Sequence, residues 1–586
     1  MPATKKEPAK EIARFCDTAG IVLLVFDGYL YGYSYFDKWG WTSKFTDRLL
    51  GVLLRSRLFN DPIVSVSLGI VLLIIGTLFR WNAKKKLWNS KDPFGVGKAG
   101  FPQEHRCLKT PASLNTPGRY RYKGQKRRSW INLVNPYRGI MIMGTPGAGK
   151  SRFVIEPLIR QLAEKGMALF VYDLKHDALS RLTYAYWLAN REQYPAKASF
   201  FTVNFTDLSR SHRCNVLQPG TLSFVSDAIG VSKTILLSLN PIWAERQGDF
   251  FVESAVNYLA ALIWWLRAYE NGKYCTLPHV IELSKLPYDQ LFSLLGTNAQ
   301  IAGLIHPFLV AYTNESTEML DGQLAGAKVP LARLASPDLY FVLTGNDFQL
   351  DINNPQAPKI FCLGGDASRL EALTPVISLY IDRINRLCNK PGKYPCALVC
   401  DEFATVRTHS MLSTLATARS NQLIPIMSIQ DISQLRTLYS RDEADALLNM
   451  CGNVFCGQAG GETARWISER FPKIQVEKES VSGTGSDNTT SRHLEWEQIV
   501  TPATVAGLSS GEFLGIVADE PGIELPRKIF HARLERVKAD RLPGVRLPVV
   551  RTVEAEEIRR QFEQIRMDIG KIVGDVMKKI MDGLDG

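Results

Sequence analysis

The hydrophobic pattern of the chain becomes an alternation of strand-like and helix-like segments near residue 139. Short apolar runs recur from that point, and each is followed by a stretch with helical periodicity. The first such runs are GIMIM, ALFVYD (168–173) and ASFFTVNF (198–205). This alternation predicts an α/β fold with a parallel central sheet covered by helices.

The strand pattern stops near residue 222 and returns only after about residue 350. Stretches such as FFVESAVNYLAALIWWLRAYE predict helices over residues 222–349. Strand-like runs then resume as KIFCLGG (359–365), CALVCDE (396–402), LIPIMSIQ (423–430), GNVFCG (452–457) and EFLGIVAD (512–519). We therefore predict one motor domain, residues 131–221 and 350–545, that is split by an inserted all-α domain.

Two apolar stretches lie near the N-terminus. Residues 63–79 form an uncharged run of 17 residues, followed by Arg80 and three lysines at 84–86. This length is at the short end for a bilayer span, and the basic flank favours a cytoplasmic side. The earlier stretch, 19–36, carries Asp27 at its centre. We predict an N-terminal transmembrane anchor of one or two helices within residues 1–83. A buried soluble helix is the alternative, whereas the late position of the stronger run argues against a signal peptide.

Three other segments have distinctive compositions. Residues 84–130 combine Gly, Pro and basic residues, which predicts a linker, and residues 479–493 are small and polar, which predicts a loop. Apolar residues at helical spacing predict an amphipathic helix in the C-terminal tail, residues 546–586.

Composition adds a preference for anionic partners. Lys and Arg number 70 against 58 Asp and Glu, which gives a formal net charge of +12. A basic excess suits polyanions or anionic lipid head groups. The ten cysteines lack the spacing of a disulfide scaffold or a zinc site, so we expect buried, reduced thiols.

The most specific motif is a phosphate-binding loop between the first apolar run and a helix. It has the pattern G-x-x-x-x-G-K-S, in which glycines let backbone N–H groups face phosphates and the helix N-terminus adds positive charge. The lysine reaches the β- and γ-phosphates of ATP, and the serine hydroxyl binds Mg²⁺. The residues are Gly144, Thr145, Pro146, Gly147, Ala148, Gly149, Lys150 and Ser151.

Two acids end the strand-like run CALVCDE. We predict that Asp401 binds Mg²⁺ and that Glu402 orients and polarises the attacking water, a pairing typical of hydrolytic motors. The alternative is two solvated acids at a strand end. Asp173 and Lys175 follow another strand at the same predicted edge, with no role assigned.

Two further residues are candidates for the hydrolytic machinery. Gln430 ends the next strand-like run, where a polar side chain can sense the γ-phosphate, or can simply cap a turn. Arg419 precedes that run in a predicted helix. It is a candidate for stabilising transition-state charge in a neighbouring subunit, and an ordinary surface arginine is the alternative.

With these motifs in place, residues 139–535 resemble the coupling-protein ATPases of type IV secretion and conjugation, the TraG/TraD-like family. VYDLKHD and LVCDEFATV are similar to family motifs, as is SHRCNVLQP, although Val216 replaces the usual proline. SIQDISQLRTLYSRDEADALLNMCGN is the most specific match, and GGETARWISER follows it.

The resemblance implies a RecA-like P-loop NTPase with ATP and Mg²⁺, anchored in the bacterial inner membrane with its motor domain in the cytoplasm. It also implies a homo-hexamer that transfers single-stranded DNA with bound relaxase to a type IV secretion channel. Two alternatives stay open: a receptor for secreted protein effectors, and a double-stranded DNA pump of the chromosome-segregation kind. An ABC transporter is disfavoured because no LSGGQ-like signature precedes Asp401.

Overall fold

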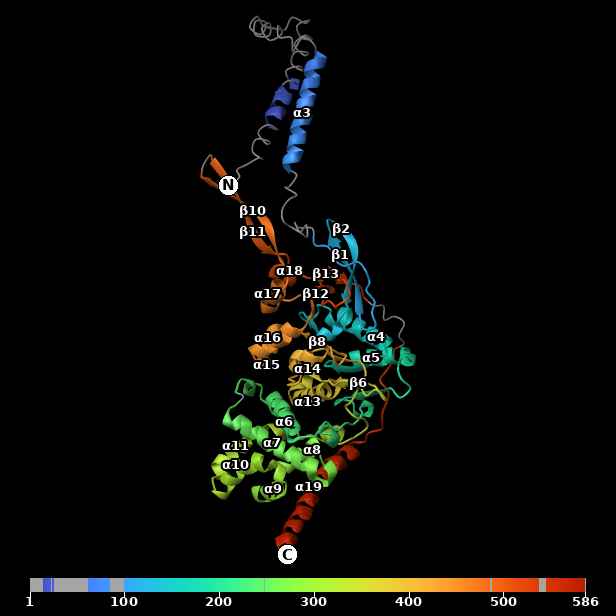
Figure 1. Cartoon of the computed structure of the whole chain (residues 1–586), viewed down its shortest axis with the longest axis vertical. Coiled ribbons are helices and arrows are strands. Elements are labelled where there is room, and N and C mark those ends of the chain that lie inside the picture. Colours follow the sequence, from blue (N-terminus) through green and yellow to red (C-terminus); the bar gives the residue numbers. More distant parts are fainter. Residues whose placement is uncertain are drawn as a thin grey trace. The chain divides into compact units, whose positions relative to one another are not determined.

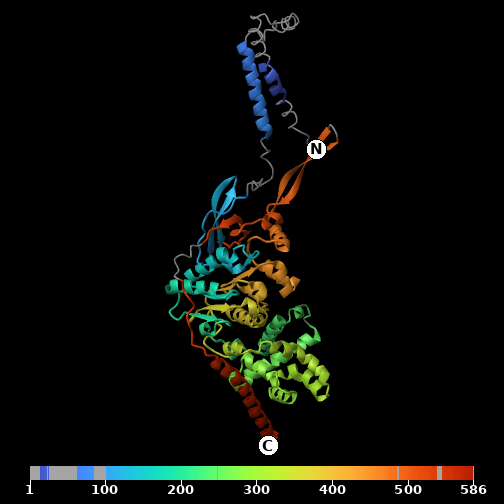
Figure 2. The same ribbon diagram turned by 180° about the vertical axis from the view of Figure 1, so that it is seen from behind.

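The chain forms two compact units, Met1–Pro93 and Phe94–Gly586. The computed structural model describes residues 14–22, 24–25, 62–84, 100–246, 248–484, 487–536 and 544–584 (Figures 1 and 2).

In the smaller unit, a helix over residues 14–22 packs against α3 (Pro62–Lys84). The two helices meet at glycines: a Cβ added to Gly20 would lie 2.9 Å from the carbonyl oxygen of Gly69. Part of the predicted first span, residues 26–36, lies outside the described residues.

The predicted membrane anchor stays a prediction. Within the described ranges, no single helix is both long enough and apolar enough to cross a bilayer, and the apolar part of α3 is Val66–Leu78. One bent pair of helices, Tyr288–Leu295 and Ala299–Thr313, reaches the length and composition, with an angle of 105° between its members.

The larger unit is built on an 11-stranded sheet with the order β2-β1-β13-β12-β9-β3-β8-β7-β4-β6-β5 (Figure 1). From β9 to β5 the strands pair in parallel, whereas β12, β13, β1 and β2 add antiparallel pairs. The strands are β1 (Leu114–Tyr122), β2 (Gln125–Leu133), β3 (Ile140–Met143), β4 (Ala168–Asp173), β5 (Ser199–Val203), β6 (Lys359–Gly364), β7 (Cys396–Cys400), β8 (Leu423–Ile429), β9 (Asn453–Cys456), β12 (Glu512–Ile516) and β13 (Ile529–Leu534). The predicted α/β class with a mostly parallel sheet is confirmed.

The central strands are apolar along their whole length because both faces of the sheet are covered. In β3, Ile140 and Ile142 pack into the core on one face, and Met141 and Met143 pack into the core on the other. This alternation is the period of two that a strand imposes on its side chains.

Helices of the motor domain cover the sheet and follow its strands. They are α4 (Glu156–Glu164), α5 (Ala178–Ala189), α13 (Leu370–Cys388), α14 (Met411–Thr417), α15 (Ile432–Tyr439), α16 (Arg441–Met450), α17 (Gly461–Glu469) and α18 (Pro502–Ala506). A short π-helix, Ser151–Ile155, leads into α4.

The insert forms a helical domain at the end of the unit opposite β1 and β2 (green in Figures 1 and 2). Its helices are α6 (Val225–Leu239), α7 (Phe250–Ala268), α8 (Leu277–Leu283), α9 (Tyr288–Leu295), α10 (Ala302–Thr313), α11 (Thr317–Ala332) and α12 (Pro337–Leu343). Its apolar side chains belong to the same core as one face of the sheet.

The C-terminal segment forms a helix that packs on the rest of the larger unit. Its helix α19 (Ala555–Leu584) buries Ile565, Ile569 and Ile572 in the core shared with the insert. The side chain of Asp568 lies 3.4 Å from His279 on α8. The amphipathic face predicted from the sequence therefore packs on the helical domain.

The predicted linker, residues 84–130, is partly wrong. Residues 114–122 and 125–133 are β1 and β2, a hairpin at the edge of the main sheet. Lys123 and Gly124 form its two-residue turn, and both have positive φ, as a type I′ turn requires. The Gly, Pro and basic residues of this segment predicted a linker, but alternate positions of the two strands, such as Tyr120 and Ile131, are buried.

The loop predicted at 479–493 is also wrong. Its backbone belongs to a two-stranded antiparallel ribbon, β10 (Lys473–Thr484) and β11 (Asp487–Gln498). Backbone pairing between neighbouring segments holds this ribbon, and a small, polar composition gives little signal of such pairing. The ten cysteines are all free and nine are buried, as their spacing predicted.

Candidate nucleotide-binding site

Four neighbouring strands bring the predicted site residues to one edge of the sheet. Because β3, β8, β7 and β4 are adjacent and parallel, their carboxyl ends lie together. The glycine-rich loop follows β3, Gln430 follows β8, and Asp401 and Glu402 follow β7, while Asp173 ends β4. Ligands of open α/β sheets bind at this edge.

The loop 144–151 has the backbone that its sequence requires. Gly147 and Gly149 have φ values of 86° and 94°, which L-residues rarely adopt. A Cβ on Gly149 would lie 2.6 Å from the Phe153 ring, so this position also lacks space for a side chain. The loop therefore needs glycine at Gly149 for both conformation and packing.

Backbone contacts from two other segments hold the loop in place. The amide of Thr145 donates to the carbonyl of Gln458, just after β9, at 2.8 Å. The amide of Gly511, just before β12, donates to the carbonyl of Ala148 at 3.0 Å. Neither hydrogen bond could be predicted from the sequence, because a contact between backbone atoms requires no particular residue type.

Lys150 and Ser151 connect the loop to its surroundings. The Lys150 ammonium is buried and donates to the carbonyl of Gly144 at 2.6 Å. Burial lowers its pKa, and the nearby carboxylates of Glu402 and Asp401 oppose that effect. The Ser151 hydroxyl donates to Oδ1 of Asp401 at 2.9 Å. Thus the two residues predicted to bind Mg²⁺ lie in direct contact.

The acidic pair is buried, with relative exposures of 6 % for Asp401 and 7 % for Glu402. Burial raises the pKa of both carboxyls; the Ser151 hydroxyl opposes this at Asp401, and the Gln430 amide opposes it at Glu402. Nε2 of Gln430 donates to Oε2 of Glu402 at 3.1 Å. Oε1 of Glu402 is buried and accepts no hydrogen bond from the described residues.

Asp173, at the end of β4, has different contacts from Asp401 and Glu402. Oδ2 of Asp173 accepts hydrogen bonds from the amide and hydroxyl of Ser180, at 2.9 and 3.0 Å, and so holds the first turn of α5. Its other oxygen, Oδ1, accepts none from the described residues. Lys175 is exposed, and its charge acts on Lys150 and both site carboxyls.

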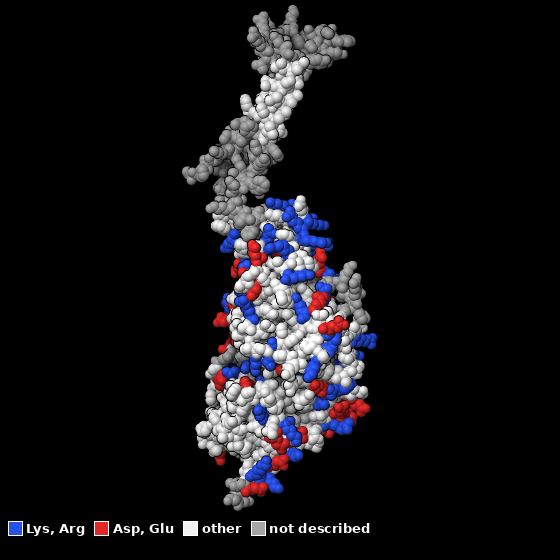
Figure 3. All heavy atoms as spheres, turned by 45° about the vertical axis from the view of Figure 1, so that its right-hand side comes forward, with Lys and Arg blue, Asp and Glu red and all other residues white. Residues whose placement is uncertain are grey.

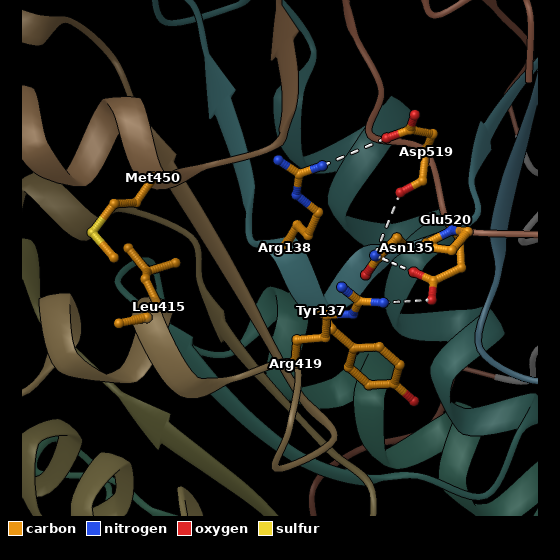
Figure 4. Close-up of a pocket in the computed structure, with 10 residues that line it drawn as sticks. Asn135, Tyr137, Arg138, Leu415, Arg419, Met450, Asp519 and Glu520 are labelled. Carbon is orange, nitrogen blue, oxygen red and sulfur yellow. Dashed lines mark hydrogen bonds and ion pairs between the residues drawn. The ribbon is translucent and has the colours of Figure 1, made fainter.

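Arg419 does not join this site within the same chain. It precedes β8, so it lies at the amino edge of the strands, about 20 Å from their carboxyl edge at 3.3 Å per residue. Figure 4 shows Arg419 directed at Glu520, with a nitrogen–oxygen distance of 2.9 Å, and Arg138 directed at Asp519. These residues line a cavity of about 400 Å³.

Two sequence families match parts of the chain. Residues 395–510 match the family described as the TraM recognition site of TraD and TraG, and residues 5–100 match the YWFCY protein family. The first match contains Asp401, Glu402, Arg419 and Gln430. A comparison with curated proteins found no match.

Solved structures of a bacterial conjugative coupling protein, TrwB, have a similar fold. An unbound form lacking the N-terminal segment has 19 % identity and a TM-score of 0.54, and the match covers 71 % of this chain and 89 % of that truncated TrwB chain. TrwB in complex with ADP and Mg²⁺ has 18 % identity and a TM-score of 0.51, covering 70 % and 88 %. TrwB with a non-hydrolysable ATP analogue has 19 % identity and a TM-score of 0.51, with the same coverage. At this identity the likeness establishes the fold.

Proposed function

We propose that this chain, whose residues 395–510 match the family described as the TraM recognition site of TraD and TraG, is a conjugative coupling ATPase. Its cargo is single-stranded DNA with a bound relaxase, which it passes to a type IV secretion channel. One observation carries the proposal: the glycine-rich loop, Asp401, Glu402 and Gln430 meet at one sheet edge inside a chain that matches this family.

The site has the oxygen donors that Mg²⁺ with a nucleotide needs. Mg²⁺ prefers hard oxygen ligands and takes few from protein, with phosphates and water completing its shell. Ser151 Oγ and Asp401 Oδ1 are such donors, 2.9 Å apart. When bound, the metal would neutralise charge on the β- and γ-phosphates. TrwB was solved with ADP and Mg²⁺, and its shared fold supports the same ligands here.

Hydrolysis then follows from the remaining side chains. A water oxygen attacks the γ-phosphorus, the bond from that phosphorus to the bridging oxygen breaks, and ADP leaves. Glu402 orients the water and accepts its proton, a role suited to a buried carboxylate whose Oε1 has no donor among the described residues. Gln430 holds Oε2 of Glu402, so it can report the state of the γ-phosphate to α15, which it precedes.

The proposal includes a membrane-anchored homo-hexamer in the bacterial inner membrane, with the motor domain in the cytoplasm. The apolar run Val66–Leu78 and the basic residues that follow this run support the anchor. Arg419 lies away from its own site, so any action of this arginine on a nucleotide requires a neighbouring subunit, which the hexamer would supply.

Arg419→Ala is expected to abolish hydrolysis in the assembled protein, and Glu520→Ala is expected to retain it. Both variants break the same ion pair, which is half exposed and contributes about 0–1 kcal/mol to stability. The measurement is the ATPase rate of each variant and of an Arg419→Ala and Lys150→Ala mixture. Equal losses in both single variants, or no recovery in mixed rings, would contradict action between subunits.

Directed movement separates the DNA motor from a receptor for protein effectors. Full-length protein, ATP and a single-stranded oligonucleotide with streptavidin at one end are mixed, and streptavidin release is measured. We expect release that requires ATP and is absent in Glu402→Gln. Release from a duplex alone would indicate a double-stranded pump, and no release from either, with DNA-independent hydrolysis, would favour protein cargo.

A further inference from the structure

The hairpin of β1 and β2 carries a dense row of basic side chains that the ATPase site does not use. Its exposed members are Arg119, Arg121, Lys123, Lys126, Arg127 and Arg128. Figure 3 shows Lys and Arg side chains gathered at the end of the larger unit where Figure 1 places this hairpin. These six residues, with Arg533 of the adjacent β13, are termed the basic ribbon.

The register places like charges directly opposite one another. Arg119 pairs with Arg128 across the hairpin and with Arg533 across the next strand, and Arg121 pairs with Lys126. Directly paired residues share one face, so five cations occupy two adjacent rows of that face. Like charges in such positions destabilise a sheet, which makes this arrangement costly without an anionic partner.

The protein itself neutralises only part of this charge. Arg119 contacts Glu535 at 2.7 Å, and Glu512 is the residue opposite Arg533 on β12. Within the described ranges, no acidic side chain forms an ion pair with Arg121, Lys126 or Arg128. These three are exposed, so their charges are available to a ligand from solution.

We propose that the basic ribbon binds the phosphate backbone of nucleic acid. This inference rests on the proposed function, because it assigns a contact surface for the cargo of that motor. Successive rows lie two residues apart along β1, about 6.8 Å, which equals the rise of two nucleotides in a stacked strand. Arginine predominates, and its planar guanidinium binds phosphate oxygens in a bidentate manner.

Two features favour nucleic acid over a membrane surface. Surface elements that bind bilayers combine basic side chains with exposed apolar ones that enter the acyl boundary. The large hydrophobic side chains described in the hairpin are buried or half buried; Tyr122 lies beneath Lys123 and Arg127, at 5.4 and 5.2 Å from its ring centre. In the sequence, β2 is followed by β3 and then by the loop 144–151. A short segment of chain therefore connects the proposed cargo-binding surface to the nucleotide site.

The test is a triple variant, Arg121→Gln, Lys126→Gln and Arg128→Gln, in the full-length protein. Affinity for a fluorescein-labelled single-stranded oligonucleotide is measured by anisotropy across a salt series. Each lost phosphate contact removes about 0.7 from the slope of log affinity against log salt, so the slope should fall by about 2. A duplex of the same sequence, at about 0.9 per contact, shows which form the ribbon holds.

The matched control removes three positive charges from another surface. It combines Arg559→Gln, Arg560→Gln and Lys571→Gln at exposed positions of α19, and it should have the wild-type slope. Replacing Arg121 and Arg128 by lysine should keep the slope, because the charges stay. The triple variant should melt no lower than the wild type, since it removes like-charge pairs, and its ATPase rate without DNA should match the wild type.

Each outcome decides the proposal. A triple variant with the wild-type slope overturns the proposal, as does an α19 control whose slope falls by the same amount. In either case, DNA-stimulated hydrolysis by the wild type would still support the motor. A different result is a triple variant that keeps the wild-type slope but no longer floats with anionic phospholipid vesicles, while its flotation with neutral vesicles is unchanged. That result would identify the basic ribbon as a membrane-binding surface. A wild type that binds neither oligonucleotide contradicts both this inference and the proposed function.

Discussion

Lys150→Ala should reduce ATP hydrolysis by a factor on the order of 10²–10³, the loss that follows removal of one charge-stabilising donor. Its ammonium is buried within the loop, 2.6 Å from the Gly144 carbonyl, and it is the only charged side chain of residues 144–151. Alanine removes that charge and leaves the backbone amides in place. Nucleotide affinity should therefore fall together with the rate.

The measurement is phosphate release by full-length protein, with binding of a fluorescent ATP analogue followed in parallel. Lys197→Ala, an exposed lysine before β5, is the control for removing one positive charge. The control should match the wild type in both assays. Hydrolysis at the wild-type rate in Lys150→Ala would show that the loop 144–151 is not the catalytic nucleotide site.

Glu402→Gln should bind ATP as the wild type does and hydrolyse it about 10²–10⁴-fold more slowly, the usual contribution of a general base. The amide has nearly the shape of the carboxylate and can still accept the 3.1 Å hydrogen bond from Gln430. It cannot take a proton from water. The variant should therefore separate binding from hydrolysis, which Lys150→Ala does not.

The pH profile gives this prediction a second readout. Burial raises the pKa of Glu402, so its carboxylate is lost at a higher pH than that of an ordinary glutamate. Hydrolysis by the wild type should fall as pH decreases through that pKa, and Glu402→Gln should lack this acid limb. Lys150, Asp401 and Lys175 act on the same carboxyl, so the profile is also measured in Lys175→Ala. An acid limb that persists unchanged in Glu402→Gln would show that the wild-type limb comes from another group, such as Asp401, whose pKa burial also raises.

The sequence was sufficient to predict the parts of the site that depend on side-chain type. The loop 144–151 has an unusual glycine pattern, and Asp401 and Glu402 follow a short apolar run that predicts a buried strand. Parallel pairing then requires these segments and Gln430 to share an edge. The hydrogen bonds that join Gln458 and Gly511 to the loop have no such sequence pattern, because they are made by backbone atoms.

The edge of the sheet was harder to predict than its centre. A central strand such as β3 is buried on both faces and reads as a continuous apolar run, whereas β1 is buried on one face only. The Gly, Pro and basic residues in the segment 84–130 predict a linker, and buried positions such as Tyr120 are too few in the sequence pattern to indicate the hairpin. The ion pair of Arg419 with Glu520, from distant segments, also required the structure.

The ATPase rate of the full-length protein, with and without single-stranded DNA at two salt concentrations, tests the central claim most directly. Glu402→Gln is the blank for genuine hydrolysis. A nucleic-acid motor predicts strong stimulation by DNA that weakens at the higher salt, because phosphate contacts release counterions on binding. Hydrolysis that Glu402→Gln abolishes but that DNA leaves unchanged at both salt concentrations would contradict a DNA motor.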